Sequence, residues 1–149
     1  MIDPELKAAL DHMLGDPEHW VHVGTVTPNG EPHVTPVMLA YDDDHLYLSL
    51  TGRTKKANLE KNPKVCVSIA EDGEIAHVIV WGEVELREDA WAQERWEFAM
   101  RLILGDEAFS SQQPRALSRE GTSLGVVTPT RWRVFGLDGG PGRVPGYLV

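Results

Sequence analysis

The segment from Leu46 to Ile69 constrains the fold of this chain more than any other part of its sequence. It reads LYLSLTGRTKKANLEKNPKVCVSI, in which two alternating apolar stretches enclose a short helical stretch that opens near Arg53. Asn62-Pro63 ends the helix, because proline disfavours helical backbone in the residue before it. Alternation with a period of two is typical of strands that bury one face. The segment therefore predicts a strand, a short helix and a second strand.

The first turn of this helix is basic. Arg53, Thr54, Lys55 and Lys56 follow one another in a chain whose formal net charge is -9. The N-terminal end of a helix dipole is positive, so cations placed there are repelled by it and by one another. A bound anion relieves both repulsions, and the free N–H groups of the first turn point toward it. We predict a phosphate-binding site here, and the alternative is a solvated helix start.

The composition is that of one globular domain, which we expect to cover residues 1–149. Hydrophobic residues make up 42% of the chain and charged residues 25%, close to the average for globular proteins. The 23 Asp and Glu against 14 Lys and Arg argue against nucleic-acid binding, which needs a basic surface. No apolar run is long enough to span a bilayer, and no apolar leader is present. The single cysteine, Cys66, is expected in the core and fits a reducing compartment, so we expect a cytoplasmic protein without a membrane partner.

Six strands and two further helices are predicted along the chain. One helix lies within residues 1–17 and opens at Asp3-Pro4, and another runs from Asp89 to about Leu104. The predicted strands cover His19 to Thr27, Glu31 to Tyr41, His45 to Leu50, Lys64 to Ala70, Ile75 to Arg87 and Ser123 to Leu137. Residues 105–122 indicate an irregular crossover with one further helical turn, and residues 138–149 a loosely held tail. Close spacing and tight turns favour a mainly β fold, a six-stranded antiparallel barrel with flanking helices.

Particular residues in these strands carry structural predictions. Pro32 and Pro36 donate no ladder hydrogen bonds, so their strand is expected to lie at an edge or to face a ligand there. Gly82 is expected to mark a bulge in the long fifth strand. Apolar residues on exposed strand faces would be buried by a second copy of the chain, which predicts a homodimer. The residues expected on such faces are Val78, Val80 and Trp132.

The order of these elements resembles the pyridoxamine-5'-phosphate-oxidase-like split barrels, and more narrowly the flavin/deazaflavin (FMN/F420) oxidoreductase superfamily. The resemblance covers about residues 18–137 and rests on the basic segment G-R-T-K-K-A-N-L-x-x-N-P-x-V, followed by the G-x-V and T-P-x-R-W strands. It implies an FMN-binding split barrel and a homodimer whose cofactor lies in a groove between the subunits. The ending GGPGRVPGYLV departs from the Trp- and Arg-containing ending of true pyridoxamine phosphate oxidases, so the resemblance does not extend to vitamin B6 oxidation.

The resemblance also implies which residues bind the cofactor. The phosphate is expected on the basic loop, with Asn58 one helical turn beyond Lys55 on the same face, so that both reach one ligand. The edge of the second strand is expected to hydrogen-bond the ring, and residues of the fifth strand to line the groove wall. The expected cofactor-binding residues are Thr35, Pro36, Val37, Met38, Thr51, Arg53, Thr54, Lys55, Lys56, Asn58, His77 and Trp81.

Two functions of different classes are compatible with this sequence. The first is an oxidoreductase that transfers a hydride between F420, or alternatively FMN, and a small organic substrate; the cofactor supplies the chemistry, which fits the absence of a nucleophile motif. F420 is preferred because Lys56, Lys61 and Lys64 extend the cationic patch toward the carboxylates of its oligoglutamate tail. The second is a non-catalytic protein that binds or carries a flavin, haem or tetrapyrrole.

No metal site is predicted. His22 and His33 flank the first hairpin, but His33 is expected opposite Val26, so the two imidazoles do not face each other. No matching set of further ligands accompanies them.

Overall fold

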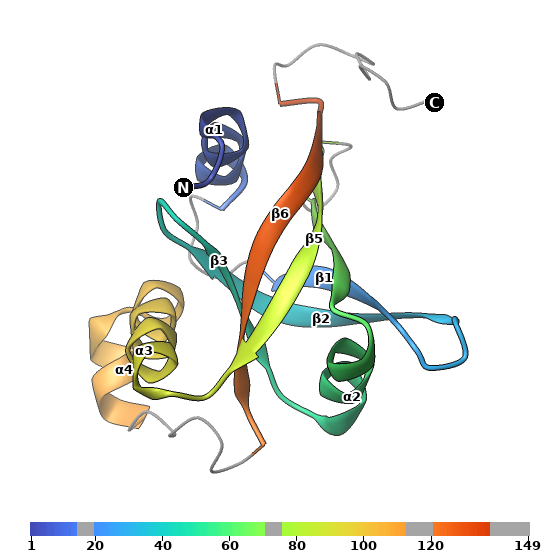
Figure 1. Ribbon diagram of the computed structural model, residues 1–149. Helices are drawn as coiled ribbons and strands as arrows, with labels where there is room; N and C mark the ends of the chain where they lie inside the picture. Colours follow the sequence, from blue (N-terminus) through green and yellow to red (C-terminus); the bar gives the residue numbers. More distant parts are fainter. Residues whose placement is uncertain (15–19, 71–75, 113–120, 138–149) are drawn as a thin grey trace.

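The computed structural model describes residues 1–14, 20–70, 76–112 and 121–137, which form a closed barrel with helices around it (Figure 1). All neighbouring strands are antiparallel, in the order β1-β2-β3-β6-β5-β4. The strands are β1 (Trp20–Val26), β2 (Pro32–Tyr41), β3 (Leu46–Leu50), β4 (Lys64–Ala70), β5 (His77–Arg87) and β6 (Ser123–Phe135). The predicted six-stranded antiparallel barrel is confirmed.

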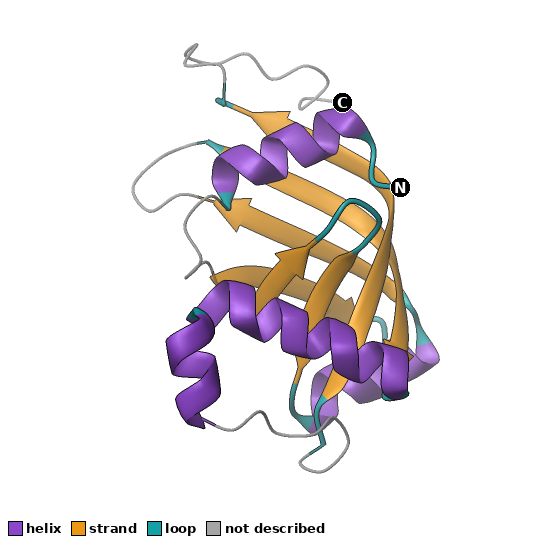
Figure 2. Cartoon of the chain, turned by 90° about the vertical axis from the view of Figure 1, so that its left-hand side faces the viewer, coloured by secondary structure: helices purple, strands orange, loops and turns teal. Residues whose placement is uncertain are grey.

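Four helices accompany the barrel. They are α1 (Pro4–Met13), α2 (Arg53–Lys61), α3 (Ala90–Leu104) and α4 (Asp106–Gln112). Figures 1 and 2 show α1 near one end of the barrel and α2 and α3 toward the other. The crossover predicted as irregular contains α4, which is longer than the single turn expected. His19, Ile75 and the predicted tail lie outside the described residues. Among the residues described, no helix has the length and apolar character needed to cross a membrane.

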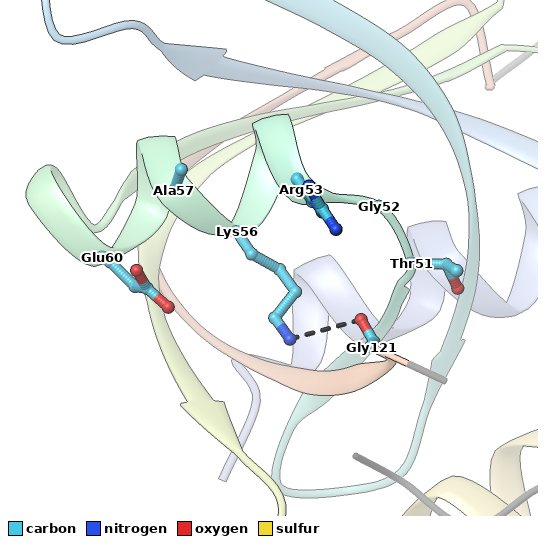
Figure 3. Close-up of a pocket in the computed structure, with 7 residues that line it drawn as sticks. All are labelled: Thr51, Gly52, Arg53, Lys56, Ala57, Glu60 and Gly121. Atoms are coloured by element: carbon cyan, nitrogen blue, oxygen red, sulfur yellow. Dashed lines mark hydrogen bonds between the residues drawn. The ribbon is translucent and has the colours of Figure 1, made fainter. Parts of the chain in front are cut away.

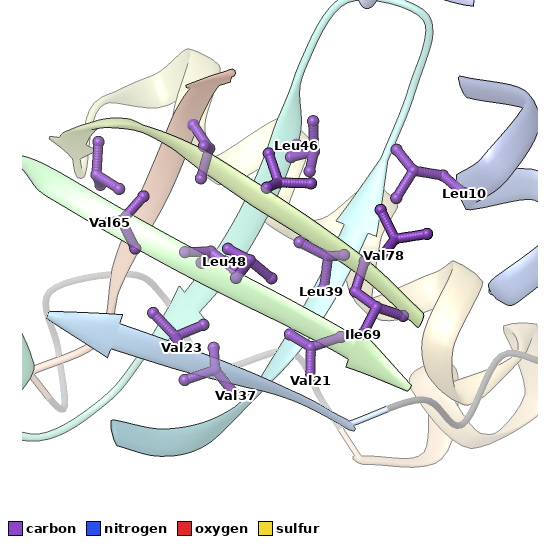
Figure 4. Packing of buried hydrophobic residues seen from close by; sticks show 14 of the residues in the cluster. Leu10, Val21, Val23, Val37, Leu39, Leu46, Leu48, Val65, Ile69 and Val78 are labelled. Atoms are coloured by element: carbon purple, nitrogen blue, oxygen red, sulfur yellow. The ribbon is translucent and has the colours of Figure 1, made fainter. Parts of the chain in front are cut away.

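The barrel interior is filled by the inward residues of its strands. Burial alternates along β1, β4 and β5, so each strand contributes every second side chain to the core. Figure 4 shows these side chains meeting between the strands, with Leu10 of α1 among them. The residues labelled there are Leu10, Val21, Val23, Val37, Leu39, Leu46, Leu48, Val65, Ile69 and Val78.

A second apolar cluster attaches α3 to the outside of the barrel. Strand β3 is buried on both faces, because Leu46 and Leu48 point into the barrel while Tyr47 packs beneath α3. The helix contributes Trp96 and Met100 to this cluster, and its N-cap is Asp89, as predicted. Residues four apart on a helix share a face, so this spacing builds one core-facing stripe.

The predicted orientation of β5 is wrong. Val78 and Val80 are fully buried in the barrel core, and Trp132 pairs with Val80 and packs against the same core. Directly paired residues lie on one face of a sheet, so Trp132 also points inward. The outward residues are Ile79 and Trp81. Apolar side chains occupy both faces of this strand, so hydrophobicity alone did not reveal which set faces the core.

Cys66 also lies on the other face from the one predicted. It pairs with Trp81 and is half-buried on the outside of the barrel, whereas Val65 and Val67 fill the interior. Burial raises the pKa of its thiol, which keeps the sulfur protonated near neutral pH.

Strand β2 has a free edge, as Pro32 and Pro36 predicted. Residues 32–38 pair with β1 on one side, and pairing with β3 begins only at Leu39. Strand β1 pairs with β4 only from His22 to Gly24. The outer part of the β1–β2 hairpin therefore projects from the barrel, which is plain in Figure 1, and leaves backbone groups of β2 unpaired by other strands.

The predicted bulge at Gly82 is confirmed by a register shift between Trp81 and Gly82 in the pairing of β5 with β6. A Cβ added at Gly82 would lie 2.5 Å from the carbonyl oxygen of Thr128, closer than van der Waals contact allows. Only glycine lets the two strands approach this closely.

We predict that Gly82→Ala lowers the free energy of unfolding by about 1–3 kcal/mol, because the backbone must shift to admit the methyl group. Gly24→Ala is the matched control on another strand, since its nearest neighbouring atom would lie at 3.6 Å, an ordinary contact. Urea unfolding of both variants provides the measurement. Equal stability of the two variants would contradict the steric argument.

Candidate functional site

The start of α2 lacks the capping seen on the two longer helices of this chain. Asp3 accepts a hydrogen bond from the Glu5 N–H at 2.9 Å at the start of α1, and Asp89 accepts one from the Ala92 N–H at 3.1 Å at the start of α3. At the corresponding position of α2 stands Gly52, which offers no side chain and has a φ of +98°. No acidic residue occupies the first turn of α2. Its first N–H groups are therefore available to an external anion.

A pocket of ≈ 600 Å³ opens at this helix start (Figure 3). Figure 3 shows Arg53 and Glu60 toward opposite ends of it, with the Lys56 side chain extending between them toward Gly121. The lining residues are Thr51, Gly52, Arg53, Lys56, Ala57, Glu60 and Gly121. Three of the predicted cofactor-binding residues, Thr51, Arg53 and Lys56, thus share one pocket. Of the three residues predicted to hold the phosphate, only Arg53 lines it, while Thr54 and Lys55 belong to the same turn.

The basic residues on and just after α2 have few partners. Within the described part of the chain, no ion pair involves Arg53, Lys55, Lys61 or Lys64. By contrast, Arg87, Arg95 and Arg101 each contact a carboxylate. A protein with net charge -9 has acids to spare, so the two unpaired cations of the first turn, Arg53 and Lys55, are consistent with a site for an external anion.

Lys56 differs from its neighbours because it is already paired. Its Nζ lies 3.3 Å from Glu88 Oε1 and donates to the Gly121 carbonyl oxygen at 3.2 Å. The Ser123 hydroxyl donates to the same Glu88 oxygen at 2.5 Å. The hydroxyl hydrogen bond and the nearby Lys56 lower the pKa of Glu88, so this carboxylate is ionised near neutral pH and offsets the charge of Lys56.

The three lysines expected to extend the cationic patch do not form one surface. Lys56 lies at the pocket, whereas Lys61 stands at the opposite end of α2, about 12 Å from Arg53 along the axis at 1.5 Å per residue. Lys64 lies on the outer face of β4 and lines a different pocket. Sequence proximity suggested one patch, but the helix and the strand direct these side chains to separate places.

Asn58 is placed inside the protein, away from the position expected of a ligand. It is 2% exposed, and its Nδ2 donates to Thr25 Oγ1 at 3.0 Å; Thr25 is itself 3% exposed. The neighbouring Leu59 is buried in the barrel core. Asn58 therefore attaches α2 to β1, and the idea that it reaches a ligand together with Lys55 does not fit its burial.

The free edge of β2 presents backbone more than side chains. Val37 is buried in the core and Met38 is partly buried against the α3 cluster, whereas Pro36 is exposed. Thr35 Oγ1 and His33 Nδ1 are buried and have no hydrogen-bond partner among the described residues. Buried polar atoms without partners are rare. These two atoms are therefore available to hydrogen-bond a group from outside the described residues.

A second pocket, of ≈ 390 Å³, lies on the outer face of β1, β2, β4 and β5. Trp81 and Cys66 line it with His22 and Lys64, and the Arg131 guanidinium stacks on the Trp81 ring at 4.1 Å. The other expected wall residue, His77, contacts Phe135 with ring centroids 5.2 Å apart and lines neither pocket. The predicted groove-wall residues are thus on a different surface from the α2 pocket.

The histidine pair of the first hairpin is separated, as expected, although the register differs by one residue. His33 pairs with Thr25 and not with Val26, and His22 pairs with Pro36. The part of the chain that the structure describes contains no group of three or more potential metal-ligating side chains.

The pocket also contains residues that sequence reasoning missed. Glu60 lies seven residues after Arg53 and four after Lys56, a spacing that places all three on one helix face. This spacing can be seen in the sequence and would have predicted that Glu60 lies beside the two basic residues. Gly121, just before β6, also lines the pocket, and beside it Lys56 contacts Glu88, just after β5, which in turn accepts from Ser123 at the start of β6. No local pattern predicts that these segments meet α2.

We predict that Thr25→Val lowers the free energy of unfolding by about 1–3 kcal/mol, because it leaves the buried Asn58 amide without its acceptor. Asn58→Leu in the same background should recover part of that loss, since both polar partners are then absent. Chemical unfolding of the two single variants and the double variant gives the coupling energy. Additive effects would show that this hydrogen bond does not fasten α2 to β1.

Comparisons with known proteins agree with this architecture. A solved structure named F420 reductase is 24% identical to the chain, covers 82% of this chain and 94% of its own, and has a TM-score of 0.63. A conserved hypothetical protein from Mycobacterium tuberculosis is 20% identical, with coverages of 100% and 96% and a TM-score of 0.70. General Stress Protein 26 from Bacillus anthracis is 19% identical, with coverages of 87% and 93% and a TM-score of 0.62. At these identities the likeness concerns the fold. No curated protein matches. Residues 3–135 match the family model described as pyridoxamine 5'-phosphate oxidase, and the chain therefore belongs to the pyridoxamine 5'-phosphate oxidase family.

Proposed function

We propose that this protein is an oxidoreductase that binds F420, or FMN as the alternative, and transfers a hydride between it and a small organic molecule. The observation that carries the proposal is the uncapped start of α2 with its unpaired cations, Arg53 and Lys55, beside a pocket of ≈ 600 Å³. The family match and the similarity to a protein named F420 reductase support the choice of a flavin-type cofactor.

The residues present fit the phosphate of such a cofactor. Arg53 offers a planar guanidinium suited to two phosphate oxygens, and the N–H groups of the first turn of α2 add donors of the same polarity. Thr51 adds a hydroxyl at the pocket wall. Each of these groups can donate a hydrogen bond to a phosphate oxygen, and an ionised phosphate needs such donors.

The free edge of β2 fits the ring system. Residues 35–38 pair only with β1, so their backbone groups that point away from β1 are paired by no strand of the barrel. Thr35 adds its buried, unpartnered hydroxyl. The N–H groups of a heterocycle can donate to the carbonyl oxygens along such an edge.

When bound, a flavin or deazaflavin supplies the hydride chemistry. The contribution of the chain is to bind the phosphate, to orient the ring along β2 and to keep water from its reactive face. No acid, base or nucleophile of the protein is assigned a role in this proposal.

We further propose a homodimer with the cofactor groove at the subunit interface. The outer face of the β1–β2 hairpin exposes Trp20 (61%) and Val34 (62%), and it continues into the second pocket with Trp81. Large apolar side chains gathered on one face are typical of an interface. This face replaces the Val78 and Val80 surface that the sequence suggested.

We predict that the protein sediments as a dimer at micromolar concentration and that Val34→Glu makes it monomeric, because a charge would be buried at the contact. Leu102→Glu on α3 is the matched control, since Leu102 is 49% exposed on another surface. Analytical ultracentrifugation distinguishes the species. A wild-type monomer, or equal effects of both variants, would overturn the proposed interface.

We predict that Arg53→Ala and Lys55→Ala each weaken cofactor binding by about tenfold to a hundredfold, since a charge-assisted bond to phosphate contributes about 1.5–3 kcal/mol. Lys61→Ala, at the far end of α2, is the matched control and should leave binding nearly unchanged. Fluorescence titration with F420 and FMN side by side measures the affinities. Unchanged affinity in both first-turn variants would instead support the alternative interpretation, a solvated helix start.

The same titration tests the choice of cofactor and the proposed activity. Tighter binding of F420 than of FMN supports the deazaflavin, and the reverse supports FMN. Reduced cofactor is then mixed with enones, quinones and tetrapyrroles, and its oxidation is followed by absorbance. Binding without oxidation by any of them would favour a flavin carrier, and a Soret band on addition of haem would favour a haem or tetrapyrrole binder.

A further inference from the structure

The part of β2 that pairs only with β1 directs two polar side chains toward the barrel interior. His33 is paired with Thr25, and Thr35 is paired with Val23. The two β1 residues are 3% and 0% exposed, and directly paired residues lie on one face of a sheet. His33 and Thr35 therefore lie on the inward face of β2, along the stretch where its other edge is free.

Both side chains have a buried polar atom without a partner. Among the described residues, none forms a hydrogen bond with His33 Nδ1 or with Thr35 Oγ1. An unsatisfied buried polar atom destabilises a protein, so a ligand that bonds it is favoured. The two residues are two positions apart on one strand, about 7 Å along it at 3.3 Å per residue. One ligand of modest size can contact both.

The first turn of α2 is connected to the same region. Asn58 donates to Thr25 Oγ1 at 3.0 Å, and Thr25 is the residue paired with His33. Lys55 lies one helical turn before Asn58 on the same face of α2 and is partly buried. Lys55, Asn58, Thr25 and His33 thus follow one another from α2 across β1 to β2. A cofactor with its phosphate at the helix start and its ring along β2 lies beside His33.

His33 is the group in this region whose charge changes in the physiological pH range. Lys55 faces the region from α2, and the exposed Glu31 stands just before β2. The residues that face His33 from β1 are Thr25 and its neighbours Val23 and Thr27, which carry no charge. Lysine and glutamate ordinarily keep their charges between pH 5 and 8, whereas histidine gains or loses a proton there.

The charge of the ring also changes during the proposed reaction. A ring that accepts a hydride gains one proton and two electrons, and so one unit of negative charge. A protonated imidazole donates from both of its nitrogens, whereas a neutral one donates from a single nitrogen. A hydrogen bond between a cation and an anion is stronger than one between neutral groups. A protonated histidine therefore binds the reduced ring better than the oxidised one.

We propose that His33 holds a proton on Nδ1 when the reduced cofactor is bound and donates this N–H to the negatively charged ring. The inference rests on the proposed function and adds a regulation of that site. The pH then sets how strongly the protein prefers the reduced cofactor over the oxidised one.

The test measures binding of both oxidation states of FMN and of F420 by anaerobic equilibrium dialysis, at several values between about pH 5.5 and 8.5. The proteins are the wild type, His33→Gln and His12→Gln. Glutamine removes the titratable group and keeps a polar side chain. His12 is the matched control, an exposed histidine in the last turn of α1. Thermal unfolding at each pH verifies that every variant remains folded.

We expect the wild-type protein near pH 6.5 to prefer the reduced cofactor several-fold more strongly than His33→Gln does, within the roughly tenfold of one charge-assisted hydrogen bond. Binding takes up a proton, so the extra affinity is present at low pH and is lost as the pH rises, by about pH 8.5. Titration of the cofactor itself cancels when two proteins are compared at one pH. His12→Gln should behave as the wild type does.

The possible failures can be told apart. Identical pH profiles in the wild type and His33→Gln, or a preference for the reduced form that grows with pH, would overturn the role of His33 and leave the cofactor site in place. So would an equal loss for both oxidation states at every pH, which would show a structural role. Failure of the wild-type protein to bind either cofactor in either state would overturn the proposed function itself.

Discussion

The attachment of α2 to the barrel is the interaction on which the candidate site depends. Leu59 inserts into the core, and the buried Asn58 amide binds the Thr25 hydroxyl of β1. Together they fix both the rotation and the depth of a nine-residue helix, which would be marginal on its own in water. Because the helix cannot rotate, its first turn and the Arg53–Lys56–Glu60 face stay at the pocket. A buried hydrogen bond thus positions charges that are themselves on the surface.

Much of the fold could be predicted because the information is local. Several signals depend only on residues a few positions apart. They are the period of two in β1 and β4, the helix stop at Asn62-Pro63 and the N-cap Asp89. The direction in which β5 faces could not be predicted, since Val78 and Trp81 are both apolar and either face could have been the inner one. That choice is made when β5 pairs with β6, which lies far away in the sequence, and with β4 in the closed barrel.

In the candidate site, too, some features follow from local sequence and others depend on residues far apart in the chain. The basic helix start is a local signal, and the structure places Thr51, Arg53 and Lys56 around one pocket. The pairing of Lys56 with Glu88 is not local, because these residues are 32 positions apart. Counting cations along the sequence therefore overestimated the positive charge of the pocket. The relevant quantity is the charge that remains after tertiary ion pairs have formed.

The free edge of β2 has a consequence for solubility. In an antiparallel pair, only alternate residues direct their N–H and C=O groups toward the partner strand. Pro32 and Pro36 have no N–H to donate, so regular hydrogen bonding to β1 depends on the residues that alternate with them. The proline nitrogens then lie along the open side, where two donors that a foreign strand needs are missing. An exposed edge ordinarily invites other chains to add as further strands and aggregate. Here the carbonyl oxygens of the edge remain available to a small heterocycle, whereas the two missing N–H donors disfavour pairing with a further polypeptide strand.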